Sequence, residues 1–168
     1  TKLYNRRGFE IQLENLFRSS EELGVAALVM IDADGLKGIN DNYGHEMGDV
    51  YLQKIANIIN NFGIKGSLAS RYGGDEFLLL LYEYDDEEEL NNTLKTLYYI
   101  QEHSSAYLGK NLRVPLRFSM GYSLATPDSE FQALLKEADT KMYEDKRERK
   151  AKEQKAKRLL YLMYTTVR

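Results

Sequence analysis

The 168-residue sequence contains no cysteine, which excludes a disulfide scaffold, a thiolate zinc site and a cysteine nucleophile. It also lacks long apolar runs: the longest, residues 25–31 and 77–82, are far too short to span a bilayer. The chain opens on polar and basic residues, so no secretory leader is expected. With 43% hydrophobic and 29% charged residues, it has the balance of one ordinary folded domain. We therefore expect a cytoplasmic domain without membrane contact of its own, either free or as the cytoplasmic portion of a larger or membrane-anchored protein.

Charge is unevenly distributed along the chain. The net charge is −3, but residues 141–158 carry nine basic residues against four acidic ones, which makes that segment +5 and the remainder −8. A basic segment on an acidic body can attract phosphates, although such a run is more often the solvated face of a terminal helix. No aromatic residue lies among the basic ones between positions 146 and 158, so nucleic-acid binding is not expected.

Hydrophobic spacing predicts alternating helices and strands. Apolar residues three and four apart predict helices over residues 9–23, 47–62, 85–97 and 131–162. Apolar segments predict strands at residues 25–31, 68–72 and 77–84, and a strand pair or one long strand over 114–125. This order contains a βαββαβ unit. We therefore predict a single α/β sandwich with a ferredoxin-like core, in which helices flank a central antiparallel or mixed sheet.

Two acidic clusters fall at the ends of predicted neighbouring strands. Asp32 and Asp34 directly follow the buried strand, and Asp75 and Glu76 directly follow a two-glycine turn. Because side chains alternate along a strand, one of the second pair is expected to meet Asp32 across the sheet. Carboxylates brought together repel one another unless a cation lies between them, and hard oxygen ligands favour magnesium over zinc. The alternative is that all four are solvent-facing turn residues.

The turn before the second cluster is Gly73-Gly74. Two glycines between strands predict a tight hairpin with positive φ angles. Glycine also allows a substrate to lie against such a turn.

Five blocks of sequence, in order, resemble the motifs of the GGDEF family of diguanylate cyclases. Residues 73–77 contain the complete signature, and residues 32–49 (DADGLKGINDNYGHEMGD) resemble the block upstream of it. LYNRRGF at residues 3–9 resembles the N-terminal motif, and SMGY at 119–122 and ADTKMY at 138–143 resemble the C-terminal ones. The resemblance covers residues 1–150 and implies a fold related to the palm architecture of nucleotide cyclases and polymerases. Residues 151–168 are expected to form a basic helical extension of unknown role.

The resemblance implies an enzyme of bacterial signalling that condenses two GTP molecules into cyclic di-GMP and releases two pyrophosphates. It further implies a two-fold dimer and a requirement for Mg²⁺, with Mn²⁺ as a substitute. Asp32, Asp75 and the Ala33 carbonyl would hold the metal. Asp75 and Glu76 would be the essential acidic pair, with Asp75 the candidate base for the attacking 3'-hydroxyl, and Lys37 would stabilise transition-state charge. An upstream sensor or dimerisation region is expected, because the chain begins inside the family's first motif.

Phosphate binding is implied at two further places. Backbone N–H groups around Gly35 and Leu36 would cradle the phosphates of GTP, and Lys146 would contact them. The glycine and arginine that follow this lysine in the family are replaced here by Arg149 and Lys150. Lys150 keeps the positive charge for phosphate binding but lacks the bidentate fork of arginine.

Guanine recognition is implied at Asn40 and Asp49. A carboxylate that accepts from guanine N1–H and N2–H₂ rejects adenine, which offers no such donors. His45 lies in the same block and either contacts the ligand or caps or packs at the start of a helix. Gly73 and Gly74 would let the nucleotide approach the turn.

The sequence also departs from the family pattern. Ile64 and Ser67 stand where the product-inhibition site has arginine and aspartate. Feedback through that site is therefore not expected, although other feedback routes stay open. The main alternative function is a catalytically weak or inactive GTP-binding module that regulates a partner domain. Asp75→Ala would separate the two, because it would abolish turnover whereas a scaffold would keep its partner.

Overall fold

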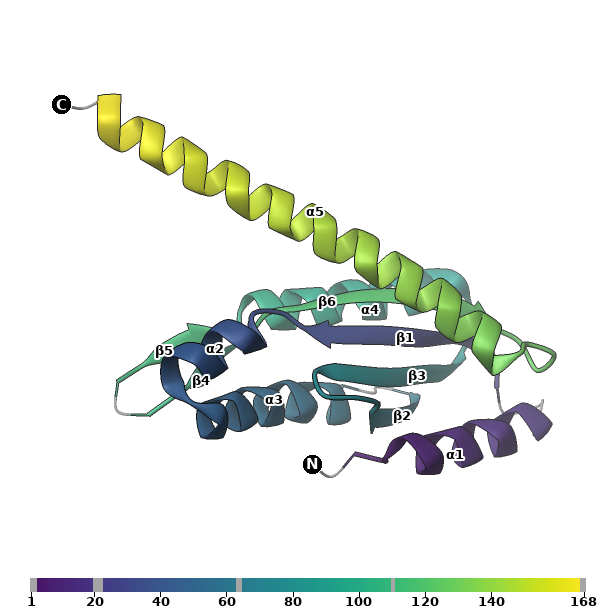
Figure 1. The fold of residues 1–168 in the computed structure, drawn as a ribbon. Coiled ribbons are helices and arrows are strands. Elements are labelled where there is room, and N and C mark those ends of the chain that lie inside the picture. Colours follow the sequence, from purple (N-terminus) through teal and green to yellow (C-terminus); the bar gives the residue numbers. More distant parts are fainter. Residues whose placement is uncertain (1–2, 20–22, 63–64, 110, 167–168) are drawn as a thin grey trace.

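The computed structural model describes residues 3–19, 23–62, 65–109 and 111–166 (Figure 1). In chain order its elements are α1 (Arg6–Arg18), β1 (Val25–Ala33), α2 (Leu36–Tyr43), α3 (His45–Asn60), β2 (Gly66–Arg71), β3 (Glu76–Tyr84), α4 (Glu87–Glu102), β4 (Ser105–Tyr107), β5 (Arg113–Pro115), β6 (Phe118–Ala125) and α5 (Phe131–Thr166). The predicted order of helices and strands is therefore confirmed, with α2 and β4 as additions.

The main sheet has four strands in the order β2-β3-β1-β6, and every neighbouring pair is antiparallel. Together with the helices between the strands, this is the predicted ferredoxin-like βαββαβ core. The region predicted as a strand pair or one long strand divides at Leu116 and Arg117. β5 pairs with β4 in a separate two-stranded sheet, and β6 joins the main sheet beside β1.

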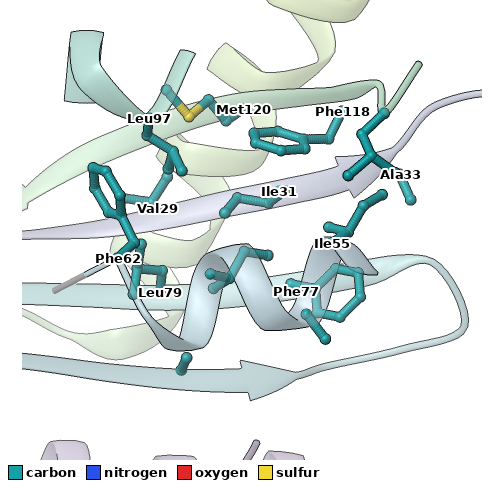
Figure 2. Packing of buried hydrophobic residues seen from close by; sticks show 14 of the residues in the cluster. Val29, Ile31, Ala33, Ile55, Phe62, Phe77, Leu79, Leu97, Phe118 and Met120 are labelled. Atoms are coloured by element: carbon teal, nitrogen blue, oxygen red, sulfur yellow. The ribbon is translucent and has the colours of Figure 1, made fainter. Parts of the chain in front are cut away.

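The core has two halves because β1 is buried on both faces. Ala27, Val29 and Ile31 belong to the half of the core that includes α3 and α4. Figure 2 shows Val29 and Ile31 packed among residues of these helices such as Ile55 and Leu97. The alternate residues of β1, Ala26, Leu28 and Met30, point to the opposite face and pack with Phe9 and Leu13 of α1 and with Leu134, Ala138 and Met142 of α5. The two-residue period of a strand thus gives a helix–sheet–helix sandwich.

β1 continues two residues beyond its predicted end, through Asp32 and Ala33. Its continuous apolar run stops at Ile31, but the ladder to both neighbouring strands does not. Asp32 therefore lies within the sheet, and the expectation that it follows the strand was wrong. Only Asp34 and Gly35 lie between the end of β1 and the start of α2.

α5 is one continuous helix of 36 residues, which confirms the single helix predicted over residues 131–162 and extends it by four residues. Its first half packs on the sheet, and its second half projects away from the rest of the domain (Figure 1). Every side chain from Ala151 to Thr165 is exposed, including the apolar run from Leu159 to Tyr164. Within the described ranges, none of the helices combines the length and the hydropathy that crossing a membrane requires. The boundary between a domain at 1–150 and an extension at 151–168 stays a prediction.

Ending the chain after Glu153 is expected to leave the melting temperature within about 2 °C of the full chain, because exposed side chains contribute little to stability. Thermal unfolding by circular dichroism measures this difference. A chain that ends before Met142, which is 5% exposed, is the contrasting control and is expected to lose its cooperative transition. A large drop in melting temperature on removing only the projecting segment would contradict the boundary.

Candidate active site

Asp32 stands at the centre of an acidic cluster at one end of the sheet. In the ladder it lies directly opposite Glu76 of β3 on one side and Ser119 of β6 on the other. Glu76 is thus the member of the second acidic pair that meets Asp32 across the sheet. Burial raises the pKa of Asp32 above its ordinary value, an effect that the hydrogen bond from Lys146 opposes.

A positive charge already lies between two of these carboxylates. The Lys146 ammonium, from α5, forms an ion pair with Asp32 Oδ1 and lies 3.6 Å from Asp34 Oδ1. The other oxygen of Asp34 accepts a hydrogen bond from Ser119 Oγ at 2.6 Å, whereas Asp34 Oδ1 is buried without a hydrogen-bond partner. The ammonium thus occupies a position between the Asp32 and Asp34 carboxylates that suits a cation.

The residues around this position fit a divalent cation of the magnesium type. In the described part of the chain, no three histidine or acidic side chains are arranged to hold a metal by themselves. Mg²⁺ ordinarily binds one or two protein carboxylates and completes its coordination with substrate phosphates and water. Asp32, the Asp34 oxygen that accepts no hydrogen bond, the Ala33 carbonyl and Asp75 are the groups here that could provide hard oxygen donors of that kind. The site therefore suits a metal that arrives with a phosphate ligand.

A cavity of about 390 Å³ opens beside the acidic cluster, and we call it the β1-end cavity. Its lining consists of Ala33, Asp34, Gly35, Leu36, Lys37, Asp75, Arg117, Lys146, Arg149, Lys150 and Glu153. Gly35 has φ +79° and is the N-cap of α2, and no side chain caps this helix. The N–H groups of a first helical turn have no partner within the helix, and they bind anions well. Five basic side chains and a helix N-terminus make this cavity suited to a polyphosphate.

A second cavity of about 270 Å³ lies between the helices that follow β1, and we call it the α2–α3 cavity. Its lining consists of Leu36, Asn40, His45, Gly48, Asp49, Leu52, Arg71, Gly74 and Asp75. Leu36 and Asp75 line both cavities, so the two adjoin. Its amide, carboxylate and imidazole groups, together with the apolar side chains of Leu36 and Leu52, suit a flat, polar, nitrogen-rich ring.

Gly48 determines where the Asn40 side chain lies in the α2–α3 cavity. It is buried in α3, and a Cβ at this position would overlap Asn40 Oδ1. Any residue larger than glycine at position 48 would displace the Asn40 amide from this position.

The turn between β2 and β3 differs from the prediction. Neither Gly73 nor Gly74 has a positive φ, so the expected tight turn with positive φ angles was wrong. The connection spans residues 72–75, which is longer than the two-residue turn that requires such angles. Gly73 instead leaves room for Glu76, because a Cβ there would lie 2.8 Å from Glu76 Oε2. The Arg71 guanidinium donates to the Gly74 carbonyl at 2.7 Å and holds the turn.

The structure brings most of the predicted site residues to the two adjoining cavities. The β1-end cavity includes Ala33, Gly35, Leu36, Lys37, Asp75, Lys146 and Lys150, and the α2–α3 cavity includes Asn40, His45, Asp49 and Gly74. Asp32, Gly73 and Glu76 belong to neither lining, and Asp32 contacts the β1-end cavity through Lys146. At His45, Gly44 is the N-cap and no side chain caps α3, so the capping interpretation lacks support. Of the two positions of the product-inhibition motif, Ile64 lies outside the described residues.

Arg71, Arg117 and Tyr51 are site-related residues that the sequence analysis missed. The two arginines line the cavities, and the Tyr51 hydroxyl contacts the backbone at Asp34 and Arg117. Arg71 directly precedes the signature, which was a usable signal. Arg117 stands alone in a short connection, and Tyr51 belongs to the apolar stripe of a helix, where it reads as a core residue, so neither carried a local signal.

Comparison with known proteins identifies the family. The model of the family "Diguanylate cyclase, GGDEF domain" matches residues 1–152, and the chain belongs to this family. It is 32% identical over 152 residues to diguanylate cyclase DgcN of Escherichia coli, covering 90% of this chain and 37% of that protein. It is also 32% identical over 142 residues to diguanylate cyclase A of Treponema denticola, covering 82% and 38%. The chain thus spans less than half the length of these relatives.

Solved structures confirm the fold. The GGDEF domain of TpbB (YfiN) from Pseudomonas aeruginosa matches with a TM-score of 0.77 and 31% identity over 88% of this chain and 87% of that one. The GGDEF domain of DgcB from Caulobacter crescentus, in complex with c-di-GMP, matches with a TM-score of 0.76 and 25% identity over 88% and 85%. An uncharacterized membrane protein of Staphylococcus saprophyticus, 32% identical over 131 residues that make up 76% of this chain and 36% of that protein, shows that relatives include membrane proteins.

In metal-free buffer, Glu76→Gln is expected to raise the melting temperature at pH 7 by about 1–4 °C, or roughly 0.5–1 kcal/mol. Burial, and then the charges of Asp75, Asp32 and Asp139, raises the pKa of Glu76, so the folded state favours its protonated form. Its charged form therefore costs stability at neutral pH, and this cost disappears as the pH falls through the raised pKa. Partial exposure keeps the effect small.

Thermal unfolding of the wild type and Glu76→Gln at pH 7 and at about pH 4 measures this effect. Glu14→Gln, at an exposed position of α1, is the control and is expected to change neither value. A gain that persists undiminished at the lower pH would contradict the electrostatic cause.

Proposed function

We propose that this domain is an active diguanylate cyclase, which joins two GTP molecules into cyclic di-GMP with release of two pyrophosphates. The observation that carries the proposal is the pair of adjoining cavities, which meet at Leu36 and Asp75. One offers hydrogen-bonding groups for a base, and the other offers basic side chains and carboxylates for a metal-bound triphosphate. A single nucleotide with its base in the α2–α3 cavity and its phosphates in the β1-end cavity accounts for both.

The α2–α3 cavity would select guanine as the base. Asp49 is exposed at the cavity wall, and its carboxylate accepts from N1–H and N2–H₂ of guanine. The half-buried Asn40 reads a further edge of the base, with His45 beside it. Adenine has no matching donors and would leave the carboxylate unpaired.

The β1-end cavity binds the triphosphate. Asp32, Asp75 and the Ala33 carbonyl would hold Mg²⁺, or Mn²⁺ in its place. The bound metal would neutralise phosphate charge and lower the pKa of the attacking hydroxyl. Lys37, Lys146 and Lys150 contribute positive charge, and the backbone at Gly35 and Leu36 contributes N–H donors. Arg117, from the connection before β6, adds a further cation to the same wall.

Each of the two condensation steps forms one bond and breaks one. The 3'-hydroxyl oxygen of one GTP attacks the α-phosphorus of the other, the bond to the β-phosphate oxygen breaks, and pyrophosphate leaves. Asp75 accepts the hydroxyl proton, and the neighbouring Glu76 is the second carboxylate of the acidic pair. Because the product has two equivalent bonds, two domains face each other in a two-fold dimer. Because the matched relatives are longer than this chain, a region outside the domain would control how often two domains meet.

Product analysis tests this proposal. The protein is incubated with GTP and Mg²⁺ over a range of protein concentrations, and nucleotides are separated by chromatography with mass detection. We expect cyclic di-GMP to rise more than linearly with protein concentration. Bound GTP without product at the highest concentration would instead support the alternative of a GTP-binding module that regulates a partner domain.

Gly48→Ala is expected to weaken GTP binding about tenfold while lowering the melting temperature only slightly. The new methyl group would overlap Asn40 Oδ1 and displace this side chain from its place in the cavity, whereas the helix backbone accepts alanine readily. Calorimetric titration with a non-hydrolysable GTP analogue measures the affinity. Gly38→Ala on α2, where a Cβ meets open space, is the matched control and is expected to bind normally. Unchanged affinity in Gly48→Ala would contradict the role of Asn40.

A further inference from the structure

The hydroxyl of Tyr51 joins three separate parts of the chain beneath the β1-end cavity. Tyr51 lies in α3 and is 1% exposed. Its hydroxyl oxygen accepts a hydrogen bond from the Arg117 N–H at 2.8 Å and lies 3.0 Å from the Asp34 carbonyl oxygen. It also lies 3.1 Å from the Arg117 carbonyl oxygen, which accepts from the Asp34 N–H at 2.9 Å. The hydroxyl has one proton and two carbonyl oxygens within hydrogen-bond distance. The Arg117 carbonyl already accepts the Asp34 N–H, so the Asp34 carbonyl, at the shorter distance, is the acceptor that we assign to this proton.

This hydrogen bond determines how one peptide group is oriented. The Asp34 C=O and the Gly35 N–H belong to the same planar trans peptide and point in opposite directions. When Tyr51 holds the carbonyl toward the core, the N–H is directed away from the core. Because both Asp34 and Gly35 line the β1-end cavity, the Gly35 N–H is then directed toward this cavity.

The peptide needs such a restraint because it precedes a glycine. Gly35 has φ +79°, and a Cβ there would meet nothing within 4 Å. Glycine adopts positive and negative φ about equally well, so local sterics resist rotation of the Asp34–Gly35 peptide only weakly. Rotation would turn the carbonyl oxygen, instead of the N–H, toward the phosphates.

We propose that Tyr51 is a positioning residue for triphosphate binding, which holds the Asp34–Gly35 peptide so that the Gly35 N–H faces the bound phosphates. This role rests on the proposed function, because it presupposes GTP in the two cavities. Tyr51 itself would not touch the substrate. It acts through the Asp34–Gly35 peptide, whose N–H contacts the phosphates. Its ring, which packs in the core between α3 and the sheet, is a separate contribution to stability.

Tyr51→Phe tests the role because it keeps the ring and removes only the hydroxyl. We expect the affinity for a non-hydrolysable GTP analogue to fall about tenfold, the effect of one hydrogen bond to a charged group. The affinity for GMP is expected to change much less, since GMP lacks two of the three phosphates. The kcat of the variant is expected to stay close to that of the wild type while KM rises.

Tyr122→Phe is the matched control. Its hydroxyl also makes a partly buried hydrogen bond, to Asn91 Oδ1 at 2.8 Å, but it lies in neither cavity lining. Tyr122→Phe is expected to lower the melting temperature without changing the ratio of the affinity for the GTP analogue to the affinity for GMP. Equal losses for the triphosphate and for GMP in Tyr51→Phe, or no loss at all, would overturn the positioning role.

A second measurement uses the wild type and is independent of how well the variant folds. The amide resonance of Gly35 is expected to shift strongly on addition of the GTP analogue and weakly on addition of GMP. The same small shift with both ligands would refute the contact. Failure of the wild type to bind GTP at all would instead refute the proposed function, so the two failures are distinguishable.

Discussion

Asp75→Asn is expected to lower the rate of cyclic di-GMP formation by at least about a thousandfold. Asp75 lines both cavities, where the base and the triphosphate of one GTP would meet. Asparagine has nearly the same shape but lacks the negative charge that binds the metal and accepts the 3'-hydroxyl proton. The Asp75 carbonyl, which accepts the Ala33 N–H at 2.9 Å, belongs to the backbone and survives the substitution. The substitution should therefore lower the turnover rate and leave the fold intact.

Chromatography of the products under saturating GTP and Mg²⁺ measures this loss. Asp41→Asn on α2 is the control, because Asp41 is exposed and lies in neither cavity lining, and its turnover is expected to match the wild type. Calorimetry should show that Asp75→Asn still binds guanosine nucleotides. Cyclic di-GMP formation by Asp75→Asn at a rate near that of the wild type would disprove the assigned role.

Asp49→Asn is expected to lower the affinity for GTP by about a hundredfold and to abolish most of the preference for GTP over ATP. Two hydrogen bonds from guanine to a carboxylate are replaced by at most one to a neutral amide, and hydrogen bonds to charged groups contribute roughly 1.5–3 kcal/mol each. The amide also presents N–H donors toward the N–H donors of the base.

Competition between GTP and ATP for a fluorescent guanine nucleotide measures the preference. Glu46→Gln is the control, because Glu46 lies in the same first part of α3 and is exposed but does not line the α2–α3 cavity. It is expected to retain wild-type selectivity. An Asp49→Asn protein that still rejects ATP would place base recognition elsewhere.

The main sheet was predictable because its signals are local. β1 and β3 consist largely of continuous apolar residues, as strands buried on both faces require, and the apolar spacing of α3 and α5 identified these helices. α2 was missed because its sequence, LKGINDNY, contains glycine and poor helix formers and buries none of its residues fully. Packing against α3, instead of intrinsic propensity, stabilises this helix.

The candidate site was predictable only in part, for a related reason. The acidic residues and the signature glycines belong to contiguous motifs, and the structure brings most of them to two adjoining cavities. The contacts that shape the backbone there are long-range: Tyr51 meets Arg117 across 66 residues of sequence, and Ser119 meets Asp34 across 85. No local pattern predicts such pairs. The backbone angles of Gly73 and Gly74 depend on the length of the connection, which the strand boundaries determine.

A crystal structure of the protein with Mg²⁺ and a non-hydrolysable GTP analogue tests most directly whether the two cavities are the halves of one nucleotide site. We expect the guanine between Asn40 and Asp49, the triphosphate against the backbone at Gly35 and Leu36, and the metal on Asp32 and Asp75. We also expect Lys146 to exchange its ion pair with Asp32 for a phosphate oxygen. A nucleotide bound with its base outside the α2–α3 cavity, or phosphates distant from the start of α2, would contradict a single nucleotide site.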